Sequence, residues 1–317
     1  MIKSITVTNY LGDSIKIDLA RPELSGFVVK SITGLGPGTS TINTTELITQ
    51  DGGLFNSARK SSRNIVISLG FLWKNSIEEV RHLSYKHFPI KKKLTLLIET
   101  DTRKAAIDGY VESNEPDIFS KDEGADISII CPDPDFYSAG EDGIKVTRFS
   151  HIEPLFEFPF GHESVDEKTL ELSVIHYHNE KSVYYEGDAE VGMTIRIHVV
   201  GGGMNPSESN QVKNITVYSD RTGESMTINT DKLKTNANFY HDYIESGDEI
   251  VICTEKGRKS IKLVNRYGDT YNILSCLTKD SKWFQLAKGN NIFGYTSESG
   301  VEHIQLEIEN RVAYEGV

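Results

Sequence analysis

The sequence predicts a mainly β protein with two domains: an N-terminal β-sandwich that carries one α-helix, an α+β arrangement, and a second sandwich made of strands. Short runs in which apolar and polar residues alternate recur along most of the chain, separated by Gly, Asn and Asp turns. One segment stands out among them by its helical spacing of apolar residues. The 317 residues exceed the roughly 100 to 200 residues of a usual domain, so two domains are expected.

The first domain is expected to place one helix between two groups of strands. The alternation predicts strands at residues 5–7, 15–17, 27–32, 94–99, 105–111 and 127–130. The helix begins at Asn75 or Ser76, whose side chains can accept hydrogen bonds from the first free amides. Glu78 and Glu79 suit the positive end of the helix dipole, and Pro89 ends the helix. The residues expected on its buried face are Ile77, Val80, Leu83 and Ser84.

A long segment, residues 33–63, separates the third strand from the rest of this domain. It is rich in Gly, Thr, Ser and Asn, and a structureless insertion of that length is uncommon in a compact domain. We expect it to form an arm that reaches a neighbouring subunit, because its scattered apolar side chains have no core of their own. These side chains, the predicted oligomer interface, are Ile42, Leu47, Ile48, Leu54 and Phe55.

Two prolines mark the end of the first domain. Pro132 and Pro134 each remove a backbone donor and fix φ, so a strand cannot continue through them. The polar segment 138–143 that follows is suited to a linker. We therefore expect a boundary near residue 140, with domains at 1–140 and 141–317.

Strands fill the second domain nearly throughout. They are predicted at residues 169–177, 182–185, 194–200, 214–218, 224–229 and 302–309, with more between 247 and 295. In that last block Ile250 and Ile252 alternate with Val251 and Cys253, which is the period of a half-buried strand. Many short strands, with turn signals about every ten residues, indicate a jelly-roll or galectin-like sandwich.

Composition argues against two classes of partner. A formal net charge of -12 does not favour a grip on nucleic acid, which needs clustered Lys and Arg, and the basic run Lys91 to Lys93 is expected to be a solvated turn. No apolar run approaches the roughly 20 residues of a membrane helix, and the first residues lack the apolar core of a signal peptide. We expect folding in a cytoplasm and no membrane insertion.

No catalytic, cofactor-binding or metal-binding site is predicted. The sequence has no G-x-S-x-G elbow and no P-loop, and its three cysteines form no C-x-x-C pair. Cys253 and Cys276 are expected to be buried thiols within strands. His176 and His178 share one face of a predicted strand without a metal-ligand signature, so a polar outer face is the favoured interpretation. Enzymatic activity is not expected.

Aromatic residues in the second domain leave carbohydrate binding open. Trp283 and Phe284 are neighbours at a predicted strand start, so one of the two must point inward and the other could stack on a sugar ring. Tyr240 and Tyr243, in an aromatic loop at residues 239–243, are the next candidates for contact with a glycan or a protein partner. Fold analogy alone does not decide between these roles.

Several ordered motifs resemble one known family. They are Ile32 to Gly38, Asp51-Gly52-Gly53, Arg63-Asn64-Ile65, Cys131 to Tyr137, the strand opening Gly247-Asp248, and the late L-x-x-G-x-N turn from Leu286 to Asn291. In this order, across nearly the whole chain, they resemble the distal tail proteins of long-tailed bacteriophages, the phage tail component family. The resemblance implies a structural protein at the tip of a phage or prophage tail, assembled in the cytoplasm of the host bacterium.

The same resemblance implies how such a protein is assembled. The first domain would form a closed ring, six-fold in that family, with a hairpin arm in the region of residues 33–63. The implied partners are further copies of the chain, the tail tube protein, the tail-associated tip protein, and receptor-binding or baseplate proteins. Two alternatives stay open: an adhesin module that binds cell-surface saccharide, and the hub of a phage-tail-like bacteriocin or injection device.

Overall fold

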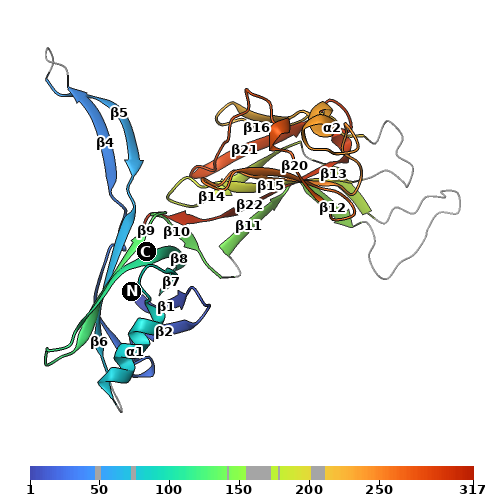
Figure 1. Ribbon diagram of the computed structural model, residues 1–317. Helices are drawn as coiled ribbons and strands as arrows, with labels where there is room; N and C mark the ends of the chain where they lie inside the picture. The colour runs from blue at the N-terminus through green and yellow to red at the C-terminus, as the bar shows by residue number, and fades with distance from the viewer. Residues whose placement is uncertain (47–50, 73–75, 141–142, 155–172, 178, 201–210) are drawn as a thin grey trace. The chain divides into compact units, whose positions relative to one another are not determined.

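The chain is mainly β, as predicted, and divides into two compact units (Figure 1). The computed structural model describes residues 1–46, 51–72, 76–140, 143–154, 173–177, 179–200 and 211–317. The first unit consists of residues 1–143 and 312–317, and the second of residues 144–311. The sequence analysis places residues 312–317 in the second domain, whereas the structure returns them to the first, because β23 (Ala313–Tyr314) pairs with β10 (Phe136–Ser138).

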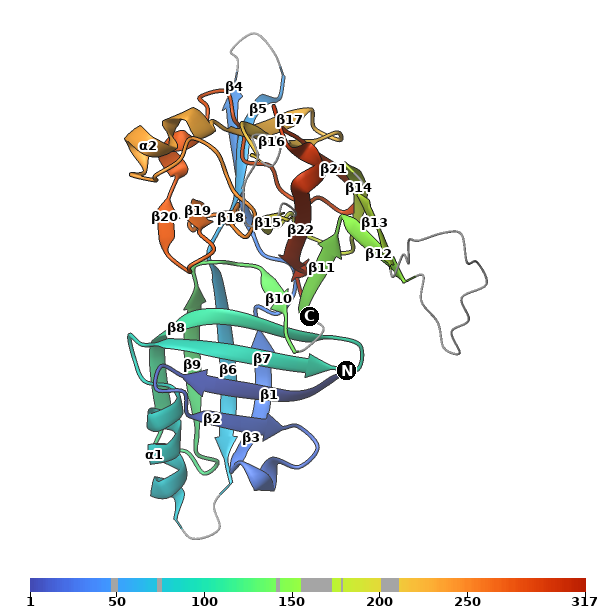
Figure 2. The same cartoon turned by 90° about the vertical axis from the view of Figure 1, so that its right-hand side faces the viewer.

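One antiparallel sheet forms most of the first unit. Its strand order is β2 (Ser14–Asp18), β1 (Ile2–Asn9), β7 (Lys93–Thr100), β8 (Lys104–Asp117), β9 (Gly124–Cys131), β6 (Arg63–Phe71) and β3 (Phe27–Thr33), with β10 beside β8. The strands β1, β2, β7 and β8 cross the direction of β3, β6 and β9, so the sheet folds over itself (Figure 2). The long strand β8 pairs with β7 on one side and with β9 on the other, so it joins the two groups of strands. A bulge between Val111 and Ser113 interrupts its pairing with β9.

The helix α1 (Ile77–His87) forms where the spacing predicts it. Its N-cap is Ser76, whose Oγ accepts a hydrogen bond of 3.2 Å from the backbone N–H of Glu78. Three apolar side chains of the predicted inward face, Ile77, Val80 and Leu83, pack against the core of the unit, and Ser84 is fully buried. The helix ends at His87, before Pro89.

Two sheets form the second unit. The larger sheet has the order β11 (Ile144–Arg148), β22 (Ile304–Arg311), β15 (Met193–Val199), β18 (Glu249–Cys253), β19 (Ser260–Val264) and β20 (Thr270–Asn272). The smaller has the order β14 (Glu180–Tyr185), β21 (Gly289–Thr296), β16 (Ile215–Ser219) and β17 (Glu224–Ile228). A separate hairpin joins β12 (Ser150–Pro154) and β13 (Ser173–Tyr177).

The inward faces of these two sheets share one core. Ile304, Leu306 and Ile308 of β22 are buried, as their alternation predicts. The hydroxyl of Tyr295 in β21 donates a hydrogen bond of 3.0 Å to the backbone oxygen of Ile304, so it links the smaller sheet to the larger one. Phe149 packs against the Tyr295 ring, with 6.3 Å between the ring centroids. The arrangement is a β-sandwich.

Short helical turns connect the strands. They are η1 (Pro22–Leu24), η4 (Thr230–Lys232), α2 (Leu233–Asn236), η5 (Leu274–Cys276) and η6 (Val301–His303). Two of them correct the sequence analysis. The last long strand begins at Ile304 and not at Glu302, because η6 precedes it. Cys276 is buried in η5 and not in a strand, while Cys253 lies in β18 but is only half-buried, on the strand's outward-facing side.

Candidate functional site: the arm and its root

The segment 33–63 contains a hairpin, here called the arm. Its strands are β4 (Ser40–Glu46) and β5 (Gly53–Lys60), which pair with each other and with no third described strand. The arm projects from the sheet of the first unit (Figure 1), and every residue of both strands is exposed. Leu47 and Ile48 of the predicted interface lie outside the described residues.

Strand pairing divides the arm into two faces. Ile42 pairs with Ala58 and Thr44 with Phe55, and a bulge at Asn56 lies between these pairs. Residues directly opposite each other, and those two apart along a strand, share a face. The apolar face of the arm is therefore made by Ile42, Thr44, Phe55 and Ala58.

The second face of the arm is mostly polar. Leu54 pairs with Thr45 and lies on this face, near the tip of the described hairpin. The three large apolar side chains, Ile42, Leu54 and Phe55, are 60%, 55% and 67% exposed. An isolated two-stranded hairpin is at best marginally stable in water, so this one needs another surface to hold its conformation.

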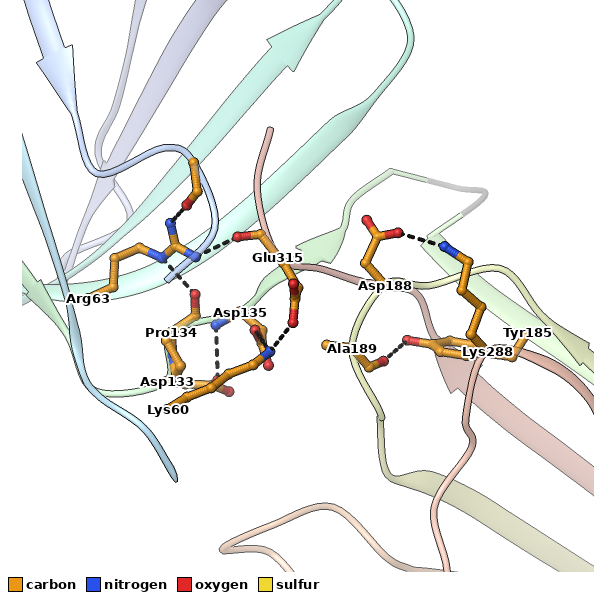
Figure 3. Close-up of polar contacts among 11 residues, drawn as sticks. Lys60, Arg63, Asp133, Pro134, Asp135, Tyr185, Asp188, Ala189, Lys288 and Glu315 are labelled. Atoms are coloured by element: carbon orange, nitrogen blue, oxygen red, sulfur yellow. Dashed lines mark hydrogen bonds and ion pairs between the residues drawn. The ribbon is translucent and has the colours of Figure 1, made fainter. Parts of the chain in front are cut away.

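The root of the arm is fixed by the buried side chain of Arg63 (Figure 3), which is 5% exposed. Its Nε donates a hydrogen bond of 2.7 Å to the backbone oxygen of Pro134, and its Nη1 donates to the backbone oxygens of Gly34, at 2.6 Å, and Gly36. Its Nη2 donates a hydrogen bond of 2.6 Å to the backbone oxygen of Glu315. Four carbonyl oxygens from three separate segments thus meet at one guanidinium.

Burial disfavours the charged form of Arg63, and the neighbouring carboxylates offset this effect only in part. Desolvation lowers the pKa of the guanidinium, and the carboxylates of Asp135 and Glu315 oppose that change. The guanidinium carbon also lies 4.7 Å from the centroid of the Phe136 ring, a cation–π contact. Because four backbone carbonyl oxygens accept the N–H groups of this buried cation, the loss of any one carbonyl leaves a desolvated N–H group without an acceptor.

Lys60 adds a second clamp at the last residue of β5 (Figure 3). Its Nζ lies 2.8 Å from Asp135 Oδ1 and 2.9 Å from Glu315 Oε1. Partial burial opposes the charge, but the hydrogen bonds to these two carboxylates outweigh it and raise the pKa of Lys60. The turn into the arm requires glycine at position 34, where φ is 85° and a Cβ would clash with the backbone oxygen of Asn64.

The aromatic candidates of the second unit are partly covered. Tyr240 is 49% exposed but stacks on Phe239 at 4.4 Å between centroids, and its hydroxyl accepts a hydrogen bond of 3.2 Å from Asn265 Nδ2. Tyr243 stacks on His241 at 4.6 Å, and His241 also contacts Tyr240. The structure therefore brings Tyr240 and Tyr243 into one aromatic cluster.

Trp283 is placed differently from the prediction. It lies in irregular chain and not at the start of a strand. The residues around it are joined to β17 only by separate hydrogen bonds, such as the one from Lys282 N–H to Ser225 O, and not by continuous strand pairing. Its neighbour Phe284 points inward and is 1% exposed, so one of the pair is a core residue as predicted. Trp283 is half-buried, and Lys259 Nζ lies 5.3 Å from the centroid of its ring.

Neither a metal-binding cluster nor a membrane-spanning helix is present among the described residues. Among them, no group of three or more His, Cys, Asp and Glu side chains could hold a metal ion. The side chains of His176 and His178 lie outside the described set. Burial raises the pKa of the Cys131 thiol to about 11, so that thiol stays protonated at neutral pH. In the same described part of the chain, no helix is long and apolar enough to cross a membrane.

The sequence analysis missed most of the root. Arg63 appears there only within a motif, and Lys60, Asp135 and Glu315 do not appear as a group. No local pattern marks them, because Arg63 and Glu315 are separated by 252 positions in the sequence. The one available signal was a charged residue at the start of a strand that is otherwise mostly apolar.

Comparisons with known proteins extend this picture. No protein-family model matches the sequence. None of the curated proteins matches it either. The crystal structure of the SPP1 Dit protein, described as a paradigm of the hub adsorption apparatus in phages that infect Gram-positive hosts, superposes with a TM-score of 0.60. That match has 12% sequence identity and covers 96% of this chain and 98% of the other.

A second solved structure is more distant. It is a chain of the phage P2 baseplate in its activated conformation with Ca, with a TM-score of 0.46 and 11% identity over 98% of this chain and 99% of that one. At 12% identity, the superposition on SPP1 Dit shows a shared fold. The likeness to SPP1 Dit, along nearly the full length of both chains, shows that this protein has the fold of that hub protein, which is the fold that the resemblance in the sequence implies.

Proposed function

We propose that the protein is the structural hub of a phage or prophage-encoded tail tip, in which the first units of several copies close into a ring. The observation that carries this proposal is the arm. It is a hairpin with one apolar face, exposed in the single chain and held at its root by Arg63 and Lys60. The fold shared with SPP1 Dit supports the same role.

In the proposed ring each arm lies against the next copy. The contact joins two different surfaces, so successive copies are related by a rotation, and a rotation that closes gives a ring. The resemblance in the sequence suggests six copies. Burial of Ile42 and Phe55 contributes roughly 1.5 to 3 kcal/mol for each fully buried side chain, which offsets the cost of ordering the hairpin.

The ring would act through its partners and not through chemistry of its own. We infer that it joins the tail tube protein to the tail-associated tip protein and to receptor-binding or baseplate proteins, as part of the virion tail tip. A central bore would let the genome pass, and the formal net charge of -12 suits a channel that must not bind DNA. A strongly positive bore surface in a solved ring would contradict that electrostatic argument.

Saccharide binding by the second unit is a second candidate function. The observation that favours it is the aromatic cluster around Tyr240. The Tyr240 ring stays 49% exposed while it contacts Phe239 and His241, and Phe239 in turn packs against Tyr271. A fixed, half-exposed ring is a surface on which the apolar face of a sugar could stack. The adhesin alternative would use this cluster without a ring, whereas the hub of a tail-like bacteriocin would use the same ring.

Mass measurement in solution tests the hub proposal. Light scattering and native mass spectrometry of the purified chain should show one closed multiple of the 35.5 kDa subunit. Phe55→Ser should move the change from subunit to closed multiple to roughly 10- to 100-fold higher protein concentration without changing the far-UV circular dichroism. Tyr267→Ser, which alters a 77% exposed side chain of the second unit, is the control and should leave the mass unchanged. A monomer at every concentration, with no cross-link from position 55 to another copy, would contradict the proposal.

A further inference from the structure

We propose that residues 312–317, here called the staple, fix the root of the arm, so that the arm takes its position only after the whole second unit has been made. This inference deepens the proposed function, because it names what controls the element that assembles. It rests on the order of the chain and on contacts within the first unit.

The whole second unit separates the staple from the rest of the first unit along the chain. The first unit is interrupted after residue 143, and the second unit occupies residues 144–311 before the chain returns. On its return the backbone N–H of Val312 donates a hydrogen bond of 3.0 Å to Ser138 Oγ, and the N–H of Ser138 donates one of 2.8 Å to Val312 O. A growing chain that lacks the second unit therefore also lacks the staple.

The staple then reaches the segment that leads into the arm. The N–H of Val317 donates a hydrogen bond of 3.1 Å to the backbone oxygen of Leu35. At Gly316 the two backbones approach so closely that an added Cβ would lie 2.9 Å from that same oxygen. Only glycine allows this approach without a shift of one backbone.

Two cations connect the staple to the other side of the root. Arg63 donates to the backbone oxygen of Glu315, and Lys60 forms an ion pair with the Glu315 carboxylate. Without the staple, Arg63 Nη2 would lose the hydrogen bond to the backbone oxygen of Glu315. Lys60 would keep its ion pair with Asp135. Since a buried charged donor without an acceptor is costly, the side chain would move and release Gly34 and Gly36.

The consequence is a check on assembly. An arm released at its root can swing, and a swinging arm presents its apolar face in many directions, so it loses the fixed geometry that a closed ring requires. Incomplete chains would then be excluded from the ring by the same contacts that position the arm in complete ones. In these terms Arg63 and the staple are positioning elements, and Ile42 and Phe55 are the contact surface.

The experiment measures the freedom of the arm directly. Nitroxide labels at Ser57→Cys on the arm and Lys16→Cys on β2, in a Cys253→Ser background, report one distance by double electron–electron resonance. The full chain at a concentration where it is monomeric should give a single narrow distribution. Gly316→Val, which forces the staple away from Leu35, should widen it roughly twofold or more. A chain that ends at Arg311 should do the same.

The controls separate the possible failures. A label pair within the sheet of the first unit, Lys16→Cys on β2 with Asp126→Cys on β9, should stay narrow in Gly316→Val. That result would show that the sheet is intact in this variant, even if the truncated chain does not fold. If the distance distribution between the labels at positions 57 and 16 kept its width in Gly316→Val, the proposal that the staple fixes the arm would be wrong. Because the labels are read on monomers, a wider distance distribution supports the proposed role of the staple even if no ring forms. The hub proposal is tested separately, by the mass measurement.

Discussion

Ile42 and Phe55 lie on the same face of the arm, although they belong to different strands and Phe55 adjoins a bulge. The pairs Ile42 with Ala58 and Thr44 with Phe55 place both side chains on one side of the hairpin. Leu54 is next to Phe55 in sequence and lies on the opposite side. A contact surface on one face therefore depends more on Phe55 than on Leu54.

This difference between the faces gives the first prediction. Phe55→Ser and Ile42→Ser should each weaken association by roughly 10- to 100-fold, which corresponds to the loss of about 1.5 to 3 kcal/mol of apolar burial. Leu54→Ser removes a side chain of similar hydrophobicity and should weaken it less. The melting temperature of the isolated subunit should not change, since these side chains are already exposed. Sedimentation equilibrium measures the association, and an equal loss in all three variants would contradict the one-sided contact.

The second prediction concerns the root. Arg63→Lys keeps the positive charge but cannot reach four carbonyl oxygens with one planar fork, so it should destabilise the first unit by about 2 to 4 kcal/mol. Urea unfolding followed by circular dichroism measures this loss. Arg59→Lys, at an exposed position of the arm, is the matched control and should change stability by less than about 0.5 kcal/mol. A similar small effect for Arg63→Lys would show that the root does not depend on the guanidinium.

The third prediction concerns the smaller sheet of the second unit. The ring of Tyr218 lies over Gly294 on the neighbouring strand, and the Tyr218 hydroxyl donates a hydrogen bond of 2.7 Å to Glu180 Oε1. That bond and partial burial raise the pKa of Tyr218 to about 12. Gly294→Ala should displace the ring, cost about 1 to 3 kcal/mol of stability and lower the Tyr218 pKa.

Ultraviolet titration of the phenol and urea unfolding measure the two effects of Gly294→Ala. Gly36→Ala is the control for an added methyl group, because a Cβ at Gly36 would meet no other atom within 4 Å. If Tyr218 in the Gly294→Ala protein titrated as it does in the parent, the ring would not depend on the glycine beneath it.

The fourth prediction is a dependence of stability on pH. Burial raises the pKa of Asp248 from 3.8 to about 6, against the opposing effects of the backbone hydrogen bond from Arg266 and the charge of His241. The folded state holds the Asp248 proton more tightly than the unfolded state does. Asp248 therefore destabilises the folded state least below pH 3.8. Its cost grows as pH rises to about 6 and is constant above that, reaching about 3 kcal/mol.

A comparison with Asp248→Asn isolates this contribution. The free energy of unfolding of the parent, minus that of the variant, should fall by up to about 3 kcal/mol between pH 4 and pH 7. Trp283 fluorescence in a Trp73→Phe background follows the second unit during urea unfolding. A difference that is flat across this range would mean that Asp248 titrates normally.

The parts of the fold that are local in sequence could be predicted. The cap at Ser76, the buried face of α1 and the alternation of Ile250 and Ile252 each depend on neighbours within a few positions, and the structure confirms them. The position of Trp283 is harder to predict, because a bulky aromatic residue beside Phe284 is equally compatible with the start of a strand and with an irregular segment.

The parts that depend on distant partners could not be predicted. The sequence predicts the exposure of Phe55, because the segment around it offers no core. The face on which Phe55 lies depends on a bulge that no residue type indicates. The contact between Arg63 and Glu315 joins the two ends of a unit that is interrupted by 168 residues, from 144 to 311. Nothing in the local sequence of either residue indicates that separation.

An electron cryomicroscopy structure of the assembled protein would show directly where the arm of each copy lies. We expect a closed ring with rotational symmetry, in which Ile42 and Phe55 of each copy are buried against the first unit of the next. An assembly in which these two side chains remain in solvent, or fold back onto their own subunit, would contradict it.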